Sequence, residues 1–195
     1  RSQGWVVATQ QSDTTHFTQT MTAGDDPKPI ARFSFRATST DEGFADLIAH
    51  EADIVMSVRV VRAVETKLAS EAGLGRLDAP RQSRIVGLDA LVPVVSMRSD
   101  VSVISLSDIA DAFSGRITRW TDINGEDLPL TVHLGPEADG QVQRFIDEVV
   151  RASGGKMSAE VIRHASDEEL AAAVDADAGA LGILPQTVVE NVQPI

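Results

Sequence analysis

The residues with the clearest chemical potential stand at the starts of two predicted helices. Ser39-Thr40-Asp41-Glu42 matches a capping box, and Asp139-Gly140-Gln141 precedes a second helical pattern of apolar residues. The first turn of a helix offers unpaired backbone N–H groups and the positive end of the helix dipole, so two helix starts facing one cleft can hold an anion. Ordinary helix capping explains each start equally well, and both interpretations stay open here.

Other chemistries find little support in the residue pattern. The four histidines show no short ligand spacing, and the absence of cysteine excludes thiolate metal sites and cysteine nucleophiles. Gly154-Gly155-Lys156 lacks a P-loop's first glycine, because Val150 holds that position. Asp175–Gly179 lacks the third acidic ligand of a calcium loop, and Ser166, near His164, is better explained as a helix cap. We therefore expect no enzyme, no cofactor and no metal site.

The charge of the chain narrows the class of partner. Acidic residues outnumber basic residues 29 to 17, which gives a net charge of -12. A surface this acidic repels phosphate backbones and anionic lipid, so we expect no nucleic-acid partner and no membrane surface. The 195 residues suffice for two small lobes, and a 43% hydrophobic content excludes disorder. The chain opens with Arg1 rather than methionine, which suggests a processed protein or a piece of a longer one.

The elements that must position the two helix starts alternate along the chain. Strands separated by helices of about 10–15 residues imply βαβ units, an α/β fold and mostly parallel sheets. The polar stretch from Thr9 to Thr22 has no clear assignment. Apolar patterns predict strands at 5–8, 30–36, 53–58, 85–88, 91–95, 128–134 and 180–184, and helices at 39–51, 62–72, 107–113, 140–152, 158–164 and 166–174. Ser105 or Ser107 is the expected cap of the helix that ends at Phe113.

Several of these stretches resemble one protein family. The motif from Leu106 to Asp122, LSDIADAFSGRITRWTD, is similar to the second-lobe motif of phosphate-specific substrate-binding proteins of ABC transporters. Thr38–Phe44 with Leu47–Ile54 resembles the first-lobe segment of those proteins, and Gly87–Val95 resembles their crossing strand. The resemblance covers roughly residues 30 to 190 and returns at His164–Ser166 and Ala180–Ile183. It is closest to the branch fused to a peptidoglycan-binding domain like that of outer-membrane protein A.

This resemblance implies a two-lobed periplasmic-binding-protein-like type II fold with the ligand between the lobes. Lobe one would be residues 1–87 plus 184–195, a discontinuous and truncated lobe, and lobe two would be residues 88–183. The family holds phosphate with amides and hydroxyls at helix starts, with an arginine and an acidic residue. Carried over to this chain, the anion-cleft residues are Ser39, Thr40, Arg59, Asp139, Gly140 and Gln141.

The sequence departs from the family pattern in both lobes. Where the family has a Gly-Ser-Gly-Thr type turn, this chain has Ala138-Asp139-Gly140-Gln141, and the family's upstream arginine falls at Gly135. The acidic position of lobe one falls at Val58, next to Arg59, and the family's opening strand and Ser/Thr-rich loop have no match in residues 1–29. We therefore expect a degenerate oxyanion site, and an exposed edge or apolar face on lobe one that favours self-association.

Three functional hypotheses follow. The first is a periplasmic solute-binding module for a small, phosphate-like oxyanion, for which phosphate itself is a doubtful ligand. The second is a non-transport interaction or spacer domain of a cell-envelope protein, linked to peptidoglycan through another domain. The third is the effector-binding domain of a transcription regulator, which the motif ending at Asp122 disfavours because that motif belongs to the phosphate branch.

Overall fold

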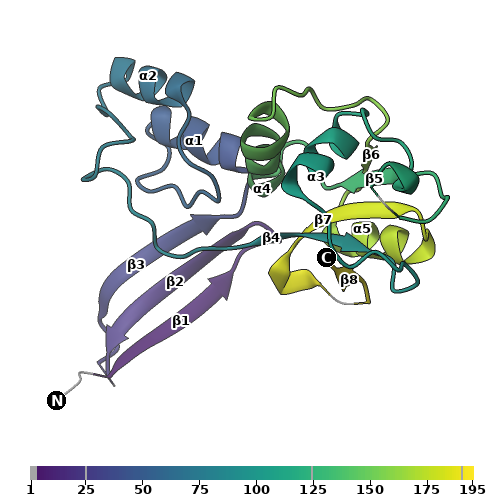
Figure 1. Ribbon diagram of the computed structural model, residues 1–195. Helices are drawn as coiled ribbons and strands as arrows, with labels where there is room; N and C mark the ends of the chain where they lie inside the picture. The colour runs from purple at the N-terminus through teal and green to yellow at the C-terminus, as the bar shows by residue number, and fades with distance from the viewer. Residues whose placement is uncertain (1–3, 25, 124, 190) are drawn as a thin grey trace.

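The structure is a computed structural model that describes residues 4–24, 26–123, 125–189 and 191–195. It contains two separate β-sheets, which lie in different parts of the molecule (Figure 1). The first sheet is built by the N-terminal strands, and the second by strands from the rest of the chain. Two helices lie between them in sequence: α1 (Thr40–Ile48) and α2 (Ala63–Glu71).

The first sheet is an antiparallel meander of three strands. The strands are β1 (Trp5–Gln11), β2 (His16–Ala23) and β3 (Pro29–Arg36), in the order β1-β2-β3. The tight connection between the first two strands is fixed by Asp13, whose Oδ1 accepts hydrogen bonds from the backbone N–H groups of Thr15 and His16. The unassigned polar stretch from Thr9 to Thr22 is therefore part of a hairpin.

The second sheet has five strands in the order β6-β5-β7-β4-β8. Strand β5 runs parallel to β6 and β7, whereas β4 runs antiparallel to β7 and β8. The expectation of mostly parallel sheets was therefore wrong, because the N-terminal meander and the β4 pairings are antiparallel. The strands are β4 (Leu91–Val95), β5 (Thr131–Leu134), β6 (Ile162–Arg163), β7 (Ala180–Pro185) and β8 (Gln193–Pro194).

Helices cover this sheet and form the main core with it. Phe113 of α3 (Leu106–Phe113) meets Phe145 of α4 (Gly140–Phe145) edge to face at 4.9 Å between ring centroids. Both rings pack in one cluster with Leu134 of β5, while Leu170 of α5 (Asp167–Ala176) packs in a second cluster with Val94. Short turns complete the architecture: η1 (Trp120–Ile123), the π-helix η2 (Ile146–Arg151) that continues α4, and η3 (Gln186–Val188).

The sequence assigned residues 184–195 to lobe one; in the structure, Leu184, Val192 and Gln193 of this stretch pack or pair with the second sheet. Gln193 pairs with Val95 of β4, and Val192 is buried beside Val94 and Leu184. The short helix expected at 158–164 is also corrected, because Ile162–Arg163 forms strand β6 alongside β5.

The helices α1 and α2 share a small core of their own. Phe44, Ala69 and Leu77 are its buried members. The sequence predicted strands at 53–58 and 85–88. In the structure, neither 53–58 nor the slightly longer segment 84–89 belongs to a strand. Neither takes part in the backbone–backbone hydrogen bonds formed among the described residues. Ile54, Met56, Ile85, Val86 and Leu88 are all more than three quarters exposed, so these strand-like segments lack a neighbour to pair with.

Candidate functional site

The starts of α1 and α4 lie in direct contact. A Cβ added at Gly140 would lie 2.6 Å from Cγ2 of Val58 and would overlap the hydroxyl of Thr40. Thr40 is buried, with 7% of its surface exposed. The fold thus brings together two of the predicted anion-site residues, but it packs them against each other and leaves no space for an ion between them.

Asp139 caps helix α4 with its own side chain. Its Oδ1 accepts hydrogen bonds from the backbone N–H groups of Gln141, at 2.7 Å, and Val142, at 3.0 Å. The amides that would hold an anion at this helix start are therefore already occupied by a carboxylate. Gln141 is also engaged, because its Nε2 donates a 2.8 Å hydrogen bond to Oδ2 of Asp89.

Ser39 likewise serves as a helix cap. Its Oγ accepts a 3.2 Å hydrogen bond from the backbone N–H of Glu42. The reciprocal half of the predicted capping box differs from expectation, since the Glu42 carboxylate accepts from the hydroxyl of Thr38.

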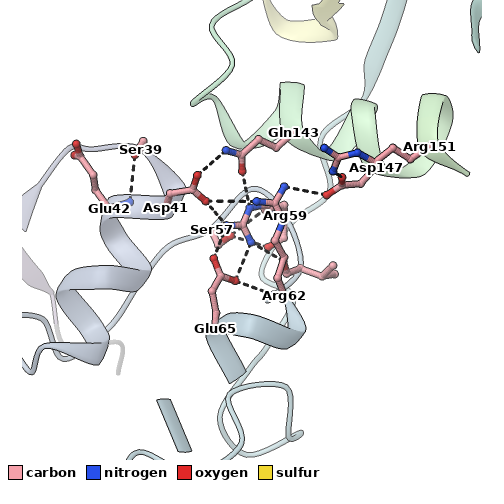
Figure 2. Close-up of polar contacts among 11 residues, drawn as sticks. Ser39, Asp41, Glu42, Ser57, Arg59, Arg62, Glu65, Gln143, Asp147 and Arg151 are labelled. Atoms are coloured by element: carbon pink, nitrogen blue, oxygen red, sulfur yellow. Dashed lines mark hydrogen bonds and ion pairs between the residues drawn. The ribbon is translucent and has the colours of Figure 1, made fainter. Parts of the chain in front are cut away.

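Arg59 is the most deeply buried charge of the group, with only 2% of its side chain exposed (Figure 2). Its Nε donates to Gln143 Oε1 at 2.9 Å, and Nη1 donates to Glu65 Oε2 and the Val60 carbonyl, both at 3.0 Å. Its Nη2 donates at 2.5 Å to Asp41 Oδ1 and to Glu65 Oε1. A guanidinium has five N–H donors, so every donor of Arg59 has a protein acceptor.

The surroundings of Arg59 keep it charged. The hydrogen bond with Glu65 is the largest cause of the raised pKa of Arg59, and it outweighs the opposing effect of burial. Burial would raise the pKa of Asp41, but hydrogen bonds from Gln143 and Arg59 leave that pKa below its ordinary value. The guanidinium carbon of Arg59 lies over the ring of Phe44, 5.3 Å from the ring centroid.

Gln143 carries this network from helix α1 to helix α4. Its Nε2 donates a 2.7 Å hydrogen bond to Asp41 Oδ2, while its Oε1 accepts from Arg59. A second link lies one turn along, where Arg62 Nη2 donates to Asp147 Oδ2 at 2.9 Å (Figure 2). We call Asp41, Arg59, Glu65 and Gln143 the Arg59 network, which connects the α1–α2 region to α4.

Arg59 was predicted from the sequence as a site residue, whereas its partners Asp41, Glu65 and Gln143 were not. The available signals were weak. Glu65 stands three residues after Arg62, and its carboxylate accepts a 2.7 Å hydrogen bond from the backbone N–H of Arg62. This spacing is that of a capping box without the usual serine. Gln143 is a polar residue between the buried Val142 and Phe145, an unusual position for an unpaired amide.

A pocket of about 60 Å³ lies beside the start of α4. Asp139, Gln141 and Asp167 supply its polar lining, next to Leu91 and Ile183. Burial raises the pKa of Asp167, and the nearby Asp139 adds to the effect. Two carboxylates in one small pocket disfavour an anionic ligand.

Two negative findings concern the described residues. Among them, no group of three or more histidine, aspartate or glutamate side chains is arranged to hold a metal ion. None of the helices that the structure describes is both long enough and apolar enough to span a membrane.

A comparison with protein families matches residues 3–191 to a family described as a PBP superfamily domain. The chain belongs to the periplasmic-binding-protein (PBP) superfamily. The match covers almost the whole chain and confirms the fold expected from its motifs. A comparison with curated protein sequences gave no significant match.

Solved structures show the same PBP fold. A phosphate transport receptor from Vibrio cholerae has a TM-score of 0.66 and 18% identity, and the match covers 82% of this chain and 62% of that one. A putative phosphate ABC transporter substrate-binding protein with bound phosphate, from Clostridium perfringens, has a TM-score of 0.63 and 18% identity, covering 80% and 60%. PstS from Borrelia burgdorferi has a TM-score of 0.57 and 15% identity, covering 82% and 63%.

This PBP-superfamily chain therefore spans about three fifths of the length of the solved structures it matches. These structures are of phosphate-binding or phosphate-transport proteins, and their likeness to this chain is one of fold.

Proposed function

We propose that this module keeps the PBP scaffold but does not capture phosphate between its lobes, and acts as a non-transport interaction domain of a periplasmic cell-envelope protein. The proposal includes a lobe boundary near residue 88 and a parent protein with a peptidoglycan-binding domain like that of outer-membrane protein A. The resemblance of Leu106–Asp122 to the phosphate branch supports this context.

The Arg59 network is the observation that carries the proposal. Arg59 is the one arginine among the expected anion-site residues, and its five donors already bind protein acceptors. Phosphate could recruit it only by leaving Glu65, with 11% of its side chain exposed, without its partner. In this geometry the arginine connects protein segments, and none of its five donors is free for a ligand.

Asp139 opposes phosphate at the other half of the site. A carboxylate is an acceptor only, so it offers phosphate no hydrogen bond. An ionised Asp139 and a phosphate about 4 Å away would repel each other by roughly 4 kcal/mol at an effective dielectric of 20. That energy corresponds to about a thousandfold loss of affinity. Its hydrogen bonds to the amides of Gln141 and Val142 also remove the donors that the helix start would provide.

One observation favours the alternative, a degenerate site for a small oxyanion. Thr40 and Gly140, which begin α1 and α4, meet at one point, so opening the contact would expose two helix starts to a common space. Ser39, Thr40, Arg59, Asp139, Gly140 and Gln141 would then line the cleft.

Calorimetry with inorganic phosphate at low salt separates the two functions. We expect no binding heat from the natural sequence, and the same result with sulfate. A micromolar or tighter dissociation constant for phosphate would overturn the proposal. The double variant Asp139→Ser with Gly135→Arg tests the cause of the loss, because it restores the serine and the arginine of the family pattern. Weak phosphate binding by this variant, and none by the natural sequence, would assign the loss to these two positions.

A further inference from the structure

The pairing register of the N-terminal sheet separates its side chains onto two unlike faces. Val7 pairs with Met21, which pairs with Ala31, and Phe17 pairs with Phe35. Since side chains alternate along a strand, the odd-numbered residues of β1 and β2 share one face with those of β3 from Ala31 to Phe35. The register of β3 shifts before Ala31, where Pro29 pairs with Thr22. That face carries the large apolar residues Trp5, Val7, Phe17, Met21, Phe33 and Phe35.

The apolar face, as we call this set of six residues, is also free of charge. None of the odd-numbered residues of the three strands is charged. The opposite face carries Arg32, Arg36 and His16, together with threonines of β2. An uncharged face is unusual in a chain in which 24% of residues are charged. The distribution is that of an antiparallel sheet with one face made for burial.

No core cluster of the described residues covers the apolar face, in which Phe17, Met21 and Phe35 are half-buried and the other three residues are exposed. Trp5 is 61% exposed, Val7 50% and Phe33 45%. The three core clusters formed by the described residues contain no side chain of β1, β2 or β3. Phe17 and Phe35 stack at 4.6 Å on each other, and the sheet extends away from the five-stranded sheet (Figure 1). A three-stranded sheet needs a covered apolar face for stability, so this face requires a partner.

We propose that the apolar face binds the apolar face of a second copy of this chain, forming a two-fold symmetric β-sandwich. Two antiparallel sheets pack face to face in this way at about 10 Å, each burying the other's apolar side chains. With a net charge of -12, two copies repel through most of their surface, and a face without charge is where they can approach. A partner chosen by charge would find no complementary group on this face. The inference goes beyond the proposed function and does not depend on phosphate binding.

Val6 and Val7 provide a matched test, because they are neighbours of the same type on opposite faces. Their exposures are 52% and 50%. In sedimentation equilibrium, we expect the natural chain to be a dimer and Val7→Lys to dimerise at least about tenfold more weakly, since two-fold symmetry places two lysines in the interface. We expect Val6→Lys to dimerise as the natural chain does, and the dimer to tighten with added salt.

A second pair of lysine variants controls for the case in which a substitution prevents folding. Phe33→Lys lies on the apolar face and Ser34→Lys on the opposite face of β3, and both are exposed positions. Circular dichroism establishes that each variant is folded before its association is measured. A monomeric natural chain at about 100 μM, or equal effects of the two lysines in both pairs, would overturn the proposal.

Pairing of β1 edges is a different association mode, and a third variant identifies it. The Gly24 amide bonds to the Gly4 carbonyl, so even-numbered residues of β1 bond to β2 while the backbone groups of Thr9 point to the open edge. Thr9→Pro removes one of these outward N–H groups and leaves the β1–β2 ladder intact. Loss of the dimer in Thr9→Pro but not in Val7→Lys would contradict face-to-face packing.

Discussion

The Nε of Arg59 donates a 2.9 Å hydrogen bond to Oε1 of Gln143, joining residues 84 positions apart in the sequence. Both side chains are buried, Arg59 in the loop after α1 and Gln143 in α4. This bond turns an arginine that could have faced an anion into a connection between two parts of the fold. Three predictions concern this network and the packing around it, and a fourth concerns the buried His133 of β5.

Arg59→Ala should destabilise the protein by about 3–5 kcal/mol, because it leaves the carboxylate of Glu65 buried without its partner. Urea unfolding measures the change. The control is Arg76→Ala, whose ion pair with Asp78 is exposed, with 75% and 41% of the two side chains accessible. The control should change stability by no more than about 1 kcal/mol. Similar losses in both variants would show that the buried network has no special weight.

Gln143→Ala should cost about 1–3 kcal/mol, because Arg59 Nε and Asp41 Oδ2 both lose a hydrogen-bond partner. Gln10→Ala, at an exposed position of β1, serves as the control. A Gln143→Ala protein as stable as the control would mean that water replaces the amide without loss, and that the two parts are joined by other contacts.

Gly140→Ala should destabilise the protein by about 1–3 kcal/mol, because the added methyl group would overlap Thr40 and Val58. Gly87→Ala is the matched control, since an added Cβ there meets nothing within 4 Å. Thermal unfolding of the two variants decides the matter. If Gly140→Ala is as stable as the natural chain, the starts of α1 and α4 are further apart in solution, as the oxyanion hypothesis requires.

His133 should make stability depend on pH in the weakly acidic range. It is 5% exposed, and its Nδ1 lies 2.9 Å from Nε2 of His164. Burial, with a further contribution from the charge of His164, lowers the pKa of His133 below its ordinary value of 6.5. A lowered histidine pKa means that the unfolded chain binds the proton more readily. The contribution of neutral His133 to the free energy of unfolding is therefore fully present above about pH 6.5, and it is lost progressively as the pH falls below that value.

The measurement is the free energy of unfolding at about pH 7.5 and about pH 5.5. We expect His133→Asn to reduce the difference between the two values. His50→Asn is the control, because His50 is exposed and asparagine tolerates its positive φ of 61°. An unchanged difference in His133→Asn, or an equal change in the control, would exclude His133 as the source.

Local patterns in the sequence predicted much of the fold. Ser39, Ser105 and Ser166 each cap a helix through a side-chain oxygen, as their patterns indicated, although Ser107 was an equal candidate for the third helix. These signals are reliable because a cap depends on residues only two or three positions apart. The polar hairpin was missed because the apolar positions Phe17 and Met21 are separated by Gln19, which weakens the alternation.

Long-range relations could not be predicted in the same way. The apolar pattern of 85–88 favours a strand, but a strand also needs a neighbour with free backbone groups, and that depends on the fold as a whole. The candidate site shows the same limit. The helix starts at Thr40 and Gly140 were found from the sequence, whereas the occupation of Arg59 depends on Gln143, which no local pattern links to it.

The segment 84–89 should be an early site of proteolysis. Arg84 lies in a stretch outside every helix and strand and outside the backbone pairing of the described residues, so trypsin should cleave after it early. The fragment from residue 85 onward would contain every strand of the five-stranded sheet and its core clusters. The fragment ending at Arg84 would hold Arg59, and Gln143 would stay with the other piece. A nicked protein would thus be held together by side-chain contacts, chiefly the hydrogen bonds of Gln143 and the Arg62–Asp147 pair. Removing Gln143 should weaken the association of the two halves, with Arg62–Asp147 as a remaining polar link.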